Sequence, residues 1–150
     1  VRWVLYNART NVFAKSLPLV YVAAVQATLG EIERRPELRQ RMWAAARRLQ
    51  KGLVDLGYDI GDTVSPITPV YVPAGDTATA MGMIQTLRER HGIFVSGVMY
   101  PVVPPGVVMF RMIPTAGHTD AEVDETLAAF RALRDDMRLD LSQKPSARNR

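Results

Sequence analysis

Residues 92–119 read GIFVSGVMYPVVPPGVVMFRMIPTAGHT and contain the pattern that decides the fold. The run predicts a strand, a proline-rich loop over Pro101–Gly106, a second strand and the start of a helix. From Val107 to Ile113 alternate side chains fall on opposite faces, and all except Arg111 are apolar. A permanently charged guanidinium on such a strand is costly unless it meets an anion. Arg111 therefore predicts either an ion pair with a carboxylate of the protein or a binding site for the carboxylate of a ligand.

The segments on both sides of this run predict alternating helices and strands. Apolar periodicity and capping residues predict helices over Leu19–Arg34, Pro36–Leu56, Asp76–His91 and Thr119–Met137. Further strands are predicted at Thr10–Ala14 and at Ile67–Val72, where Pro69 indicates an edge strand. We therefore predict an α/β fold of the α+β kind, with a few-stranded antiparallel or mixed sheet covered on one face by helices.

The composition is that of an ordinary globular domain, with 150 residues, 47% hydrophobic and 23% charged. Because cysteine is absent, disulfides, thiolate metal sites and a cysteine nucleophile are excluded. Two histidines are too few for a histidine-built metal site, so no metal is expected. No apolar run reaches the roughly 18 residues of a membrane span, and the first residues do not resemble a signal peptide. We expect a cytoplasmic protein without a transmembrane segment.

The net charge of +4 raises the question of a nucleic-acid partner. The arginines cluster around Pro36, where they are interleaved with Glu31, Glu33 and Glu37, and Trp43 is the only aromatic residue among them. Such a pattern favours a solvated helix face over a phosphate-binding surface. No nucleic-acid partner is expected.

Two regions of the sequence resemble a known enzyme family. The string YPVVPPG at Tyr100–Gly106, the strand with Arg111 and the string TAGHT at Thr115–Thr119 resemble the C-terminal region of the α-oxoamine synthases. The string YNARTNVFAKSLP at Tyr6–Pro18 resembles the segment that follows the catalytic lysine in that family. Within the family, FAKSLP and RMIPTA are most similar to serine palmitoyltransferase, and the resemblance extends to about Phe130.

The resemblance implies the C-terminal portion of a pyridoxal-phosphate-dependent acyl-CoA:amino-acid C-acyltransferase. Such an enzyme condenses an amino acid with an acyl-CoA and releases carbon dioxide, as in sphingolipid biosynthesis. The resemblance also implies pyridoxal 5'-phosphate as cofactor and a homodimer. Residues 1–35 would end the large cofactor-binding domain and supply a long connecting helix, and residues 36–141 would form the C-terminal small domain. The polar residues 142–150 predict a disordered tail.

By the same resemblance, functional roles fall on Arg111, Ser16 and Lys15. The strand arginine of the family binds the substrate carboxylate, because its planar fork matches both carboxylate oxygens. The segment with Ser16 and Lys15 reaches the phosphate of the cofactor bound to the partner subunit. Many members carry a hydroxyl residue where this chain has Ala14. Ser16 and Lys15 therefore either replace that contact or cap the helix that begins at Pro18.

The family's aldimine lysine lies upstream of the segment that Tyr6 begins, in a Ser/Thr-Lys motif followed by glycines. This chain has three lysines, Lys15, Lys51 and Lys144, and none stands in such a motif. We therefore expect no catalytic residue in this chain and no activity from the chain alone. The alternatives are a non-catalytic α/β module for assembly or small-carboxylate binding, and a glycine-using relative of the same family.

The two histidines are predicted to be structural. His118 could be a general base by residue type, but no Ser, Cys or Asp stands at a spacing that supports this role. We expect His118 to be hydrogen-bonded at the junction between strand and helix. His91 lies at a predicted helix C-terminus, where the helix dipole favours it.

Overall fold

The computed structural model describes residues 1–13 and 17–145, which form two units, Val1–Leu38 and Arg39–Arg150. The boundary between the units falls between Leu38 and Arg39, within α4 (Pro36–Asp55). From the sequence we expected a boundary between residues 35 and 36. The two units are described separately below.

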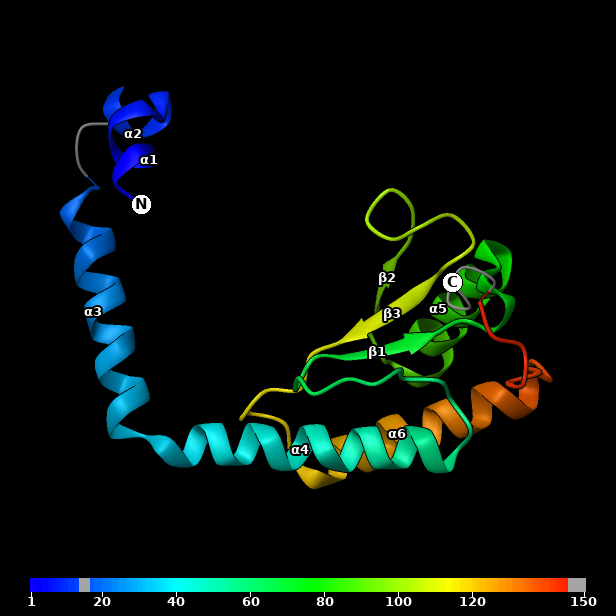
Figure 1. The fold of residues 1–150 in the computed structure, drawn as a ribbon. Coiled ribbons are helices and arrows are strands. Elements are labelled where there is room, and N and C mark those ends of the chain that lie inside the picture. The colour runs from blue at the N-terminus through cyan, green and yellow to red at the C-terminus, as the bar shows by residue number, and fades with distance from the viewer. Residues whose placement is uncertain (14–16, 146–150) are drawn as a thin grey trace. The chain divides into compact units, whose positions relative to one another are not determined.

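The first unit is helical and contains α1 (Arg2–Asn7), α2 (Arg9–Phe13) and α3 (Leu19–Arg34) (Figure 1). The prediction of α3 is confirmed at both ends. The strand predicted at Thr10–Ala14 is wrong as far as Phe13, because these residues form α2. Local hydrogen bonds favour the helix: the Asn11 amide N–H donates to the Ala8 carbonyl oxygen at 2.9 Å, and its side chain donates to the Leu5 carbonyl oxygen at 2.8 Å. The β-propensity of Thr, Val and Phe depends on a sheet that this unit does not offer.

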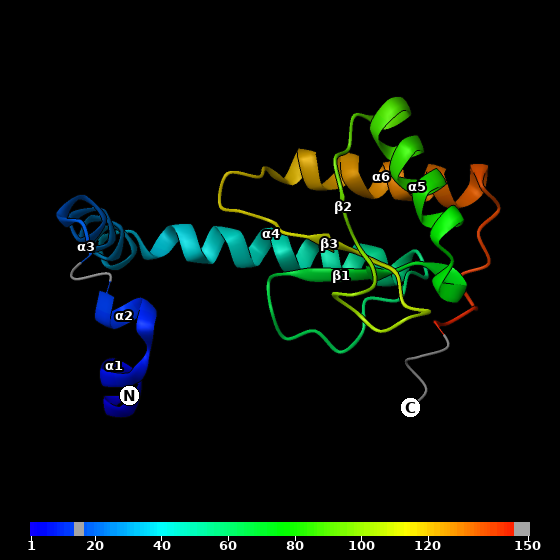
Figure 2. The ribbon, with the colours of Figure 1, turned by 90° about the horizontal axis from the view of Figure 1, so that it is seen from above.

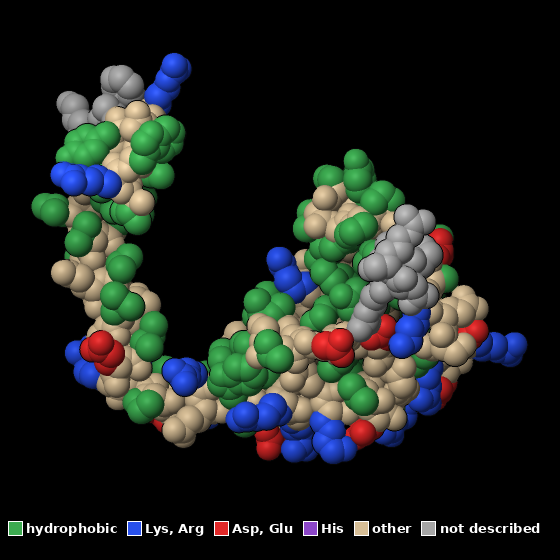
Figure 3. Space-filling model, in the orientation of Figure 1, with side chains coloured by type: hydrophobic (Ala, Val, Ile, Leu, Met, Phe, Trp, Pro, Cys, Tyr) green, Lys and Arg blue, Asp and Glu red, His purple; other side chains and the backbone are tan. Residues whose placement is uncertain are grey.

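No residue of α3 is buried, although the helix is rich in Val, Leu and Ala. Figure 3 shows hydrophobic side chains along this helix, and large ones such as Val20, Tyr21 and Leu29 are exposed. In a protein, the stability of such a helix comes mainly from packing of its apolar side chains. The other described residues of the first unit therefore do not cover α3.

The second unit contains a three-stranded antiparallel sheet in the order β1-β3-β2. Its strands are β1 (Thr68–Tyr71), β2 (Ser96–Val98) and β3 (Met109–Met112). Pro69 lies in the edge strand β1, as predicted, where its missing N–H does not disrupt a central ladder. The sheet confirms the fold class.

Helices α4, α5 (Thr77–His91) and α6 (Asp120–Asp136) cover one face of the sheet (Figures 1 and 2). Their ends follow the capping residues read from the sequence. The Asp76 carboxylate accepts from the Thr79 amide at 2.7 Å, and Gly92 ends α5 in the left-handed conformation at φ 67°. Thr119 and Glu122 form the predicted capping box at the start of α6.

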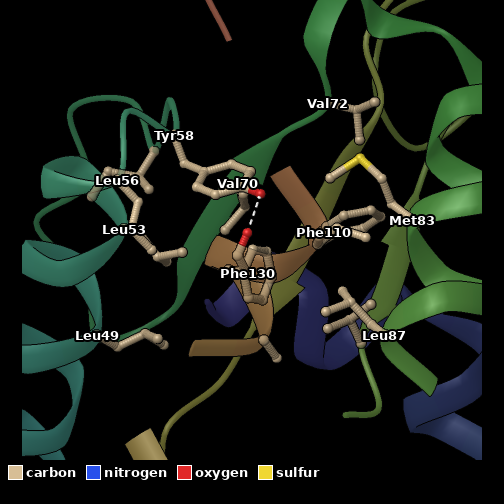
Figure 4. Close-up of a cluster of buried hydrophobic side chains, with 14 of the residues drawn as sticks. Leu49, Leu53, Leu56, Tyr58, Val70, Val72, Met83, Leu87, Phe110 and Phe130 are labelled. Carbon is tan, nitrogen blue, oxygen red and sulfur yellow. Dashed lines mark hydrogen bonds between the residues drawn. The ribbon is translucent and has the colours of Figure 1, made fainter. Parts of the chain in front are cut away.

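The core of the second unit lies between the sheet and these three helices (Figure 4). Val70 and Phe110 point from the sheet toward Phe130 of α6, and all three are fully buried. The Tyr58 hydroxyl donates to the Phe130 carbonyl oxygen at 2.8 Å, and the two rings meet edge to face with centroids 5.2 Å apart. Burial raises the pKa of the Tyr58 phenol, which keeps this donor protonated.

The proline-rich loop between β2 and β3 is fixed by a close backbone approach. A Cβ atom built on Gly75 would lie 1.9 Å from the Gly106 carbonyl oxygen, and Gly75 has a φ of +66°. Only glycine satisfies both conditions without strain. The turn Pro73–Gly75 after β1 thus holds the end of this loop just before β3.

The chain beyond α6 differs from the disordered tail expected from residue 142. The Gln143 carbonyl oxygen accepts from the Ala74 amide at 3.2 Å, and the Pro145 side chain is fully buried. Residues 146–150 lie outside the described residues. None of the helices in the described ranges combines the length and apolar character needed to cross a bilayer.

Candidate functional site

A pocket of about 600 Å³ opens at the end of β3, beside the first turns of α6. Its walls come from the end of α5 and the following loop, from β2, from β3 with the loop after it, and from α6, and Leu49 of α4 also lines it. The apolar part of the lining includes Phe94 and Ile113. Its polar side chains include Ser96, Arg111, His118, Glu122, Glu125 and Thr126.

Arg111 lies on β3 with an exposed side chain. Its neighbours in sequence, Phe110 and Met112, are on the opposite face of the sheet, which the helices cover. The sequence places apolar residues on both faces of this strand, and we therefore expected apolar surroundings for Arg111. The structure corrects this, because one face is open and Arg111 is on it. The Arg111 side chain forms no ion pair or hydrogen bond within residues 1–13 and 17–145. The internal ion pair, one of the two alternatives for Arg111, is therefore not made by the described residues.

Ser96 of β2 is the cross-strand partner of Arg111. Directly paired residues place their side chains on the same face of a sheet, about 5 Å apart at Cβ. The Ser96 hydroxyl is thus a second polar group beside the guanidinium. Sequence reasoning missed Ser96 because it could not fix the register of β2 against β3 across the long loop between them.

Glu122 contributes a carboxylate whose Oε2 is already occupied. This oxygen accepts from the Thr119 amide at 2.7 Å and from the Thr119 hydroxyl at 2.9 Å. These hydrogen bonds hold the pKa of Glu122 below its usual range. Glu125, one turn along α6 on the same wall, forms no ion pair with the part of the chain that the structure describes. The pocket therefore has both an open cation and acidic residues on its α6 wall.

His118 is hydrogen-bonded at the junction between β3 and α6, which confirms the sequence expectation. Its Nδ1 lies 2.9 Å from the Thr115 amide nitrogen and 2.9 Å from the Thr115 Oγ1. The ring also lines the pocket. His91, at the end of α5, lines the pocket as well. Its Nε2 is buried and has no hydrogen-bond partner among the described residues.

The other two predicted site residues, Lys15 and Ser16, lie outside the described residues. Lys51 lies on α4 and is ion-paired with Asp55, with its side chain 77% exposed. Within the described ranges, no group of His, Cys, Asp and Glu side chains is arranged to hold a metal ion.

Acidic neighbours partly neutralise the basic helix α4, and Figure 3 shows Lys and Arg side chains in blue over the region of α4 and α6. The Arg48 Nε and Nη2 donate to the two carboxylate oxygens of Asp124 at 2.8 and 2.7 Å, which joins α4 to α6. Arg47 lies over the Trp43 ring at 5.6 Å. These contacts give Arg47 and Arg48 roles within the fold.

Residues 1–130 match the family described as aminotransferase class I and II, and the chain belongs to that family. Its relatives place it among the α-oxoamine synthases. A cysteate-C-fatty acyltransferase from Capnocytophaga ochracea is 45% identical over 135 residues, which cover 90% of this chain and 32% of the relative. An 8-amino-7-oxononanoate synthase from Anaeromyxobacter dehalogenans is 40% identical over 130 residues, which cover 87% of this chain and 32% of the relative.

Solved structures similar to this chain come from related enzymes. A serine palmitoyltransferase from Sphingomonas wittichii is 29% identical and superposes with a TM-score of 0.77, over 90% of this chain and 34% of that one. A structure of SPT with PLP as internal aldimine is 29% identical with a TM-score of 0.78, over 90% of this chain and 34% of that one. The chain therefore spans about a third of the length of the relatives it matches.

The family and these structures imply pyridoxal 5'-phosphate as the cofactor. The described residues do not by themselves fit this group. It needs a lysine amine in an enclosed position, whereas Lys51 is ion-paired on an exposed helix face and the Lys144 side chain is exposed. Among the described residues, no lysine lines the pocket beside Arg111.

Proposed function

We propose that this chain is the C-terminal portion of a pyridoxal-phosphate-dependent acyl-CoA:amino-acid C-acyltransferase. The parent enzyme condenses an amino acid with an acyl-CoA and releases carbon dioxide and CoA. The observation that carries the proposal is the exposed Arg111 guanidinium, which lines a pocket and has no carboxylate partner among the described residues. The identity to a cysteate-C-fatty acyltransferase and to serine palmitoyltransferase supports this reaction class.

Arg111 binds the carboxylate of the amino acid in this proposal. A guanidinium offers parallel N–H donors that match the two carboxylate oxygens, and charge strengthens both hydrogen bonds. The Ser96 hydroxyl lies on the same face and can donate to the same group. Holding the carboxylate in one place also fixes the position of the adjacent carbon, which lowers the entropic cost of the reaction.

The proposed amino acid is serine, by resemblance to serine palmitoyltransferase. Cysteate is a second candidate, favoured by the 45% identity to an enzyme named for that substrate, compared with 29% for the serine palmitoyltransferases. A long-chain acyl-CoA is the proposed partner substrate in both cases. A serine-using parent would belong to sphingolipid biosynthesis.

In this proposal, the rest of the parent enzyme supplies the catalytic residues. The cofactor lysine lies in another part of the parent, and the chain contains no catalytic residue of its own. Ser16 and Lys15 contact the cofactor phosphate of a partner subunit in a cytoplasmic homodimer. The apolar side chains exposed on α3 support the existence of such covering elements. A non-catalytic module for assembly or carboxylate binding is the alternative for the chain taken alone.

Borohydride reduction and peptide mapping test where the cofactor lysine lies. In the full-length protein reduced with pyridoxal phosphate, one pyridoxyl-lysine should appear outside the 150 residues, and Lys15, Lys51 and Lys144 should remain unmodified. The 150-residue chain treated in the same way should give no site-specific adduct. Protein reduced after removal of the cofactor is the control. A stoichiometric adduct at any of these three lysines would place the cofactor site in this chain and overturn the proposal.

A further inference from the structure

The ring of His118 is held by its Nδ1 atom. The Thr115 amide N–H donates to Nδ1 at 2.9 Å, and the Thr115 hydroxyl lies at the same distance. The loop that carries these residues is itself closed, since the His118 amide donates to the Thr115 carbonyl oxygen at 3.3 Å. His118 is therefore fixed between the end of β3 and the first residue of α6.

These contacts select one tautomer of the ring. A backbone amide can only donate, so Nδ1 must accept. A neutral imidazole has one donor and one acceptor nitrogen, and its proton must then be on Nε2. Nε2 forms no hydrogen bond with the described residues. His118 thus offers a neutral N–H donor whose orientation is set by the backbone.

His118 lines the same pocket as the open guanidinium. Arg111, Ser96 and His118 all line the pocket. Glu122 lines the same pocket, but its Oε2 already accepts two hydrogen bonds from Thr119. The other titratable groups of the lining are His91 and Glu125. An anion bound by Arg111 would have remaining oxygen lone pairs, because a fork fills only part of a carboxylate's capacity.

We propose that His118, through its Nε2–H, is a second hydrogen-bond donor to the anionic group of the amino acid that Arg111 binds. His118 is then a substrate-binding residue as well as a structural one. A neutral donor helps to orient the bound anion through a directional hydrogen bond, and it adds no charge beside the acidic residues of α6. This inference rests on the proposed function of Arg111.

Two substitutions separate the donor from the structural role. His118→Asn keeps an acceptor near the position of Nδ1, so the Thr115 contact can survive, but it has no donor at the position of Nε2. His118→Gln can place an amide N–H near that position. In the full-length protein with cofactor, we expect His118→Asn to weaken the affinity for L-serine or L-cysteate about tenfold, as for a hydrogen bond to a charged group. His118→Gln should stay closer to wild type, and acyl-CoA affinity should not change in either variant.

Imidazole ¹⁵N NMR gives a readout independent of activity. In ¹⁵N-histidine-labelled protein, the His118 ring, assigned by its loss in His118→Gln, should show the pattern of a ring protonated on Nε2. Addition of L-serine or L-cysteate should shift its Nε2 resonance in wild type and leave it in place in Arg111→Ala.

The outcomes are distinguishable. A ring protonated on Nδ1, or His118→Asn and His118→Gln with equal affinities for the amino acid, would overturn the role of His118. If Arg111→Ala still weakens binding in that case, the proposed function survives. If Arg111→Ala also leaves binding unchanged, the proposed function fails together with this inference.

Discussion

Phe130→Ala is expected to lower the free energy of unfolding by about 3–5 kcal/mol, the cost of deleting a buried phenylalanine side chain. Phe130 is fully buried, packs edge to face on Tyr58, and lies at the centre of the core between α4, α5 and the sheet (Figure 4). Removal of this side chain leaves a cavity, because its neighbours belong to three different elements and cannot all move in to fill the space. Urea unfolding followed by circular dichroism measures the loss.

Phe94→Ala is the matched control for this prediction. The same side chain is deleted, but Phe94 is 80% exposed, so its removal should change the free energy of unfolding by less than about 0.5 kcal/mol. Equal losses from the two substitutions would contradict the packing described for α6 against the sheet. The pocket depends on that packing, because α6 supplies one of its walls.

Arg111→Ala is expected to weaken amino-acid binding by about 1.5–3 kcal/mol, or roughly 10- to 150-fold, as for loss of a charged hydrogen-bonding group. Arg111→Lys keeps the charge but loses the planar fork, so its affinity should fall between those of wild type and Arg111→Ala. The change in cofactor absorbance on titration with L-serine or L-cysteate measures the affinity in the full-length protein. Acyl-CoA affinity should change little.

The melting temperature of the substrate-free protein separates ligand binding from a structural ion pair. Because Arg111 is exposed and has no ion pair among the described residues, its removal should leave the melting temperature close to that of wild type. Arg131→Ala is the matched control, since Arg131 is an exposed arginine of α6 outside the pocket lining. Breaking a buried pair would instead cost about 3–5 kcal/mol. A large fall in the melting temperature of substrate-free Arg111→Ala would therefore contradict the ligand-binding role.

The sequence predicted the elements whose ends are set by local chemistry. Gly92 and the Thr119–Glu122 capping box marked helix ends that the structure confirms. Pro69 correctly indicated an edge strand. Local preference was misleading where no sheet was present to satisfy it, as in α2, and where a single distant contact decided the outcome, as for Pro145.

The candidate site was predictable only in part. Arg111 stood out because it was the only charged residue on an apolar strand, although the sequence could not show that its face is open. Ser96 and Glu125 join the pocket through strand register and the packing of α6, which no local pattern reveals. The orientation of His118 depends on a backbone hydrogen bond from Thr115, three residues earlier in a loop without a repeating pattern.

The central claim is that the parent protein is a decarboxylating C-acyltransferase, and the products of its reaction test this most directly. The full-length protein with pyridoxal phosphate is incubated with palmitoyl-CoA and with L-serine or L-cysteate labelled at the carboxylate carbon. We expect labelled carbon dioxide and free CoA in equal amounts, both dependent on the acyl-CoA, and the better amino acid identifies the substrate. Transfer of the amino group to an oxo acid without release of carbon dioxide or CoA would contradict the claim.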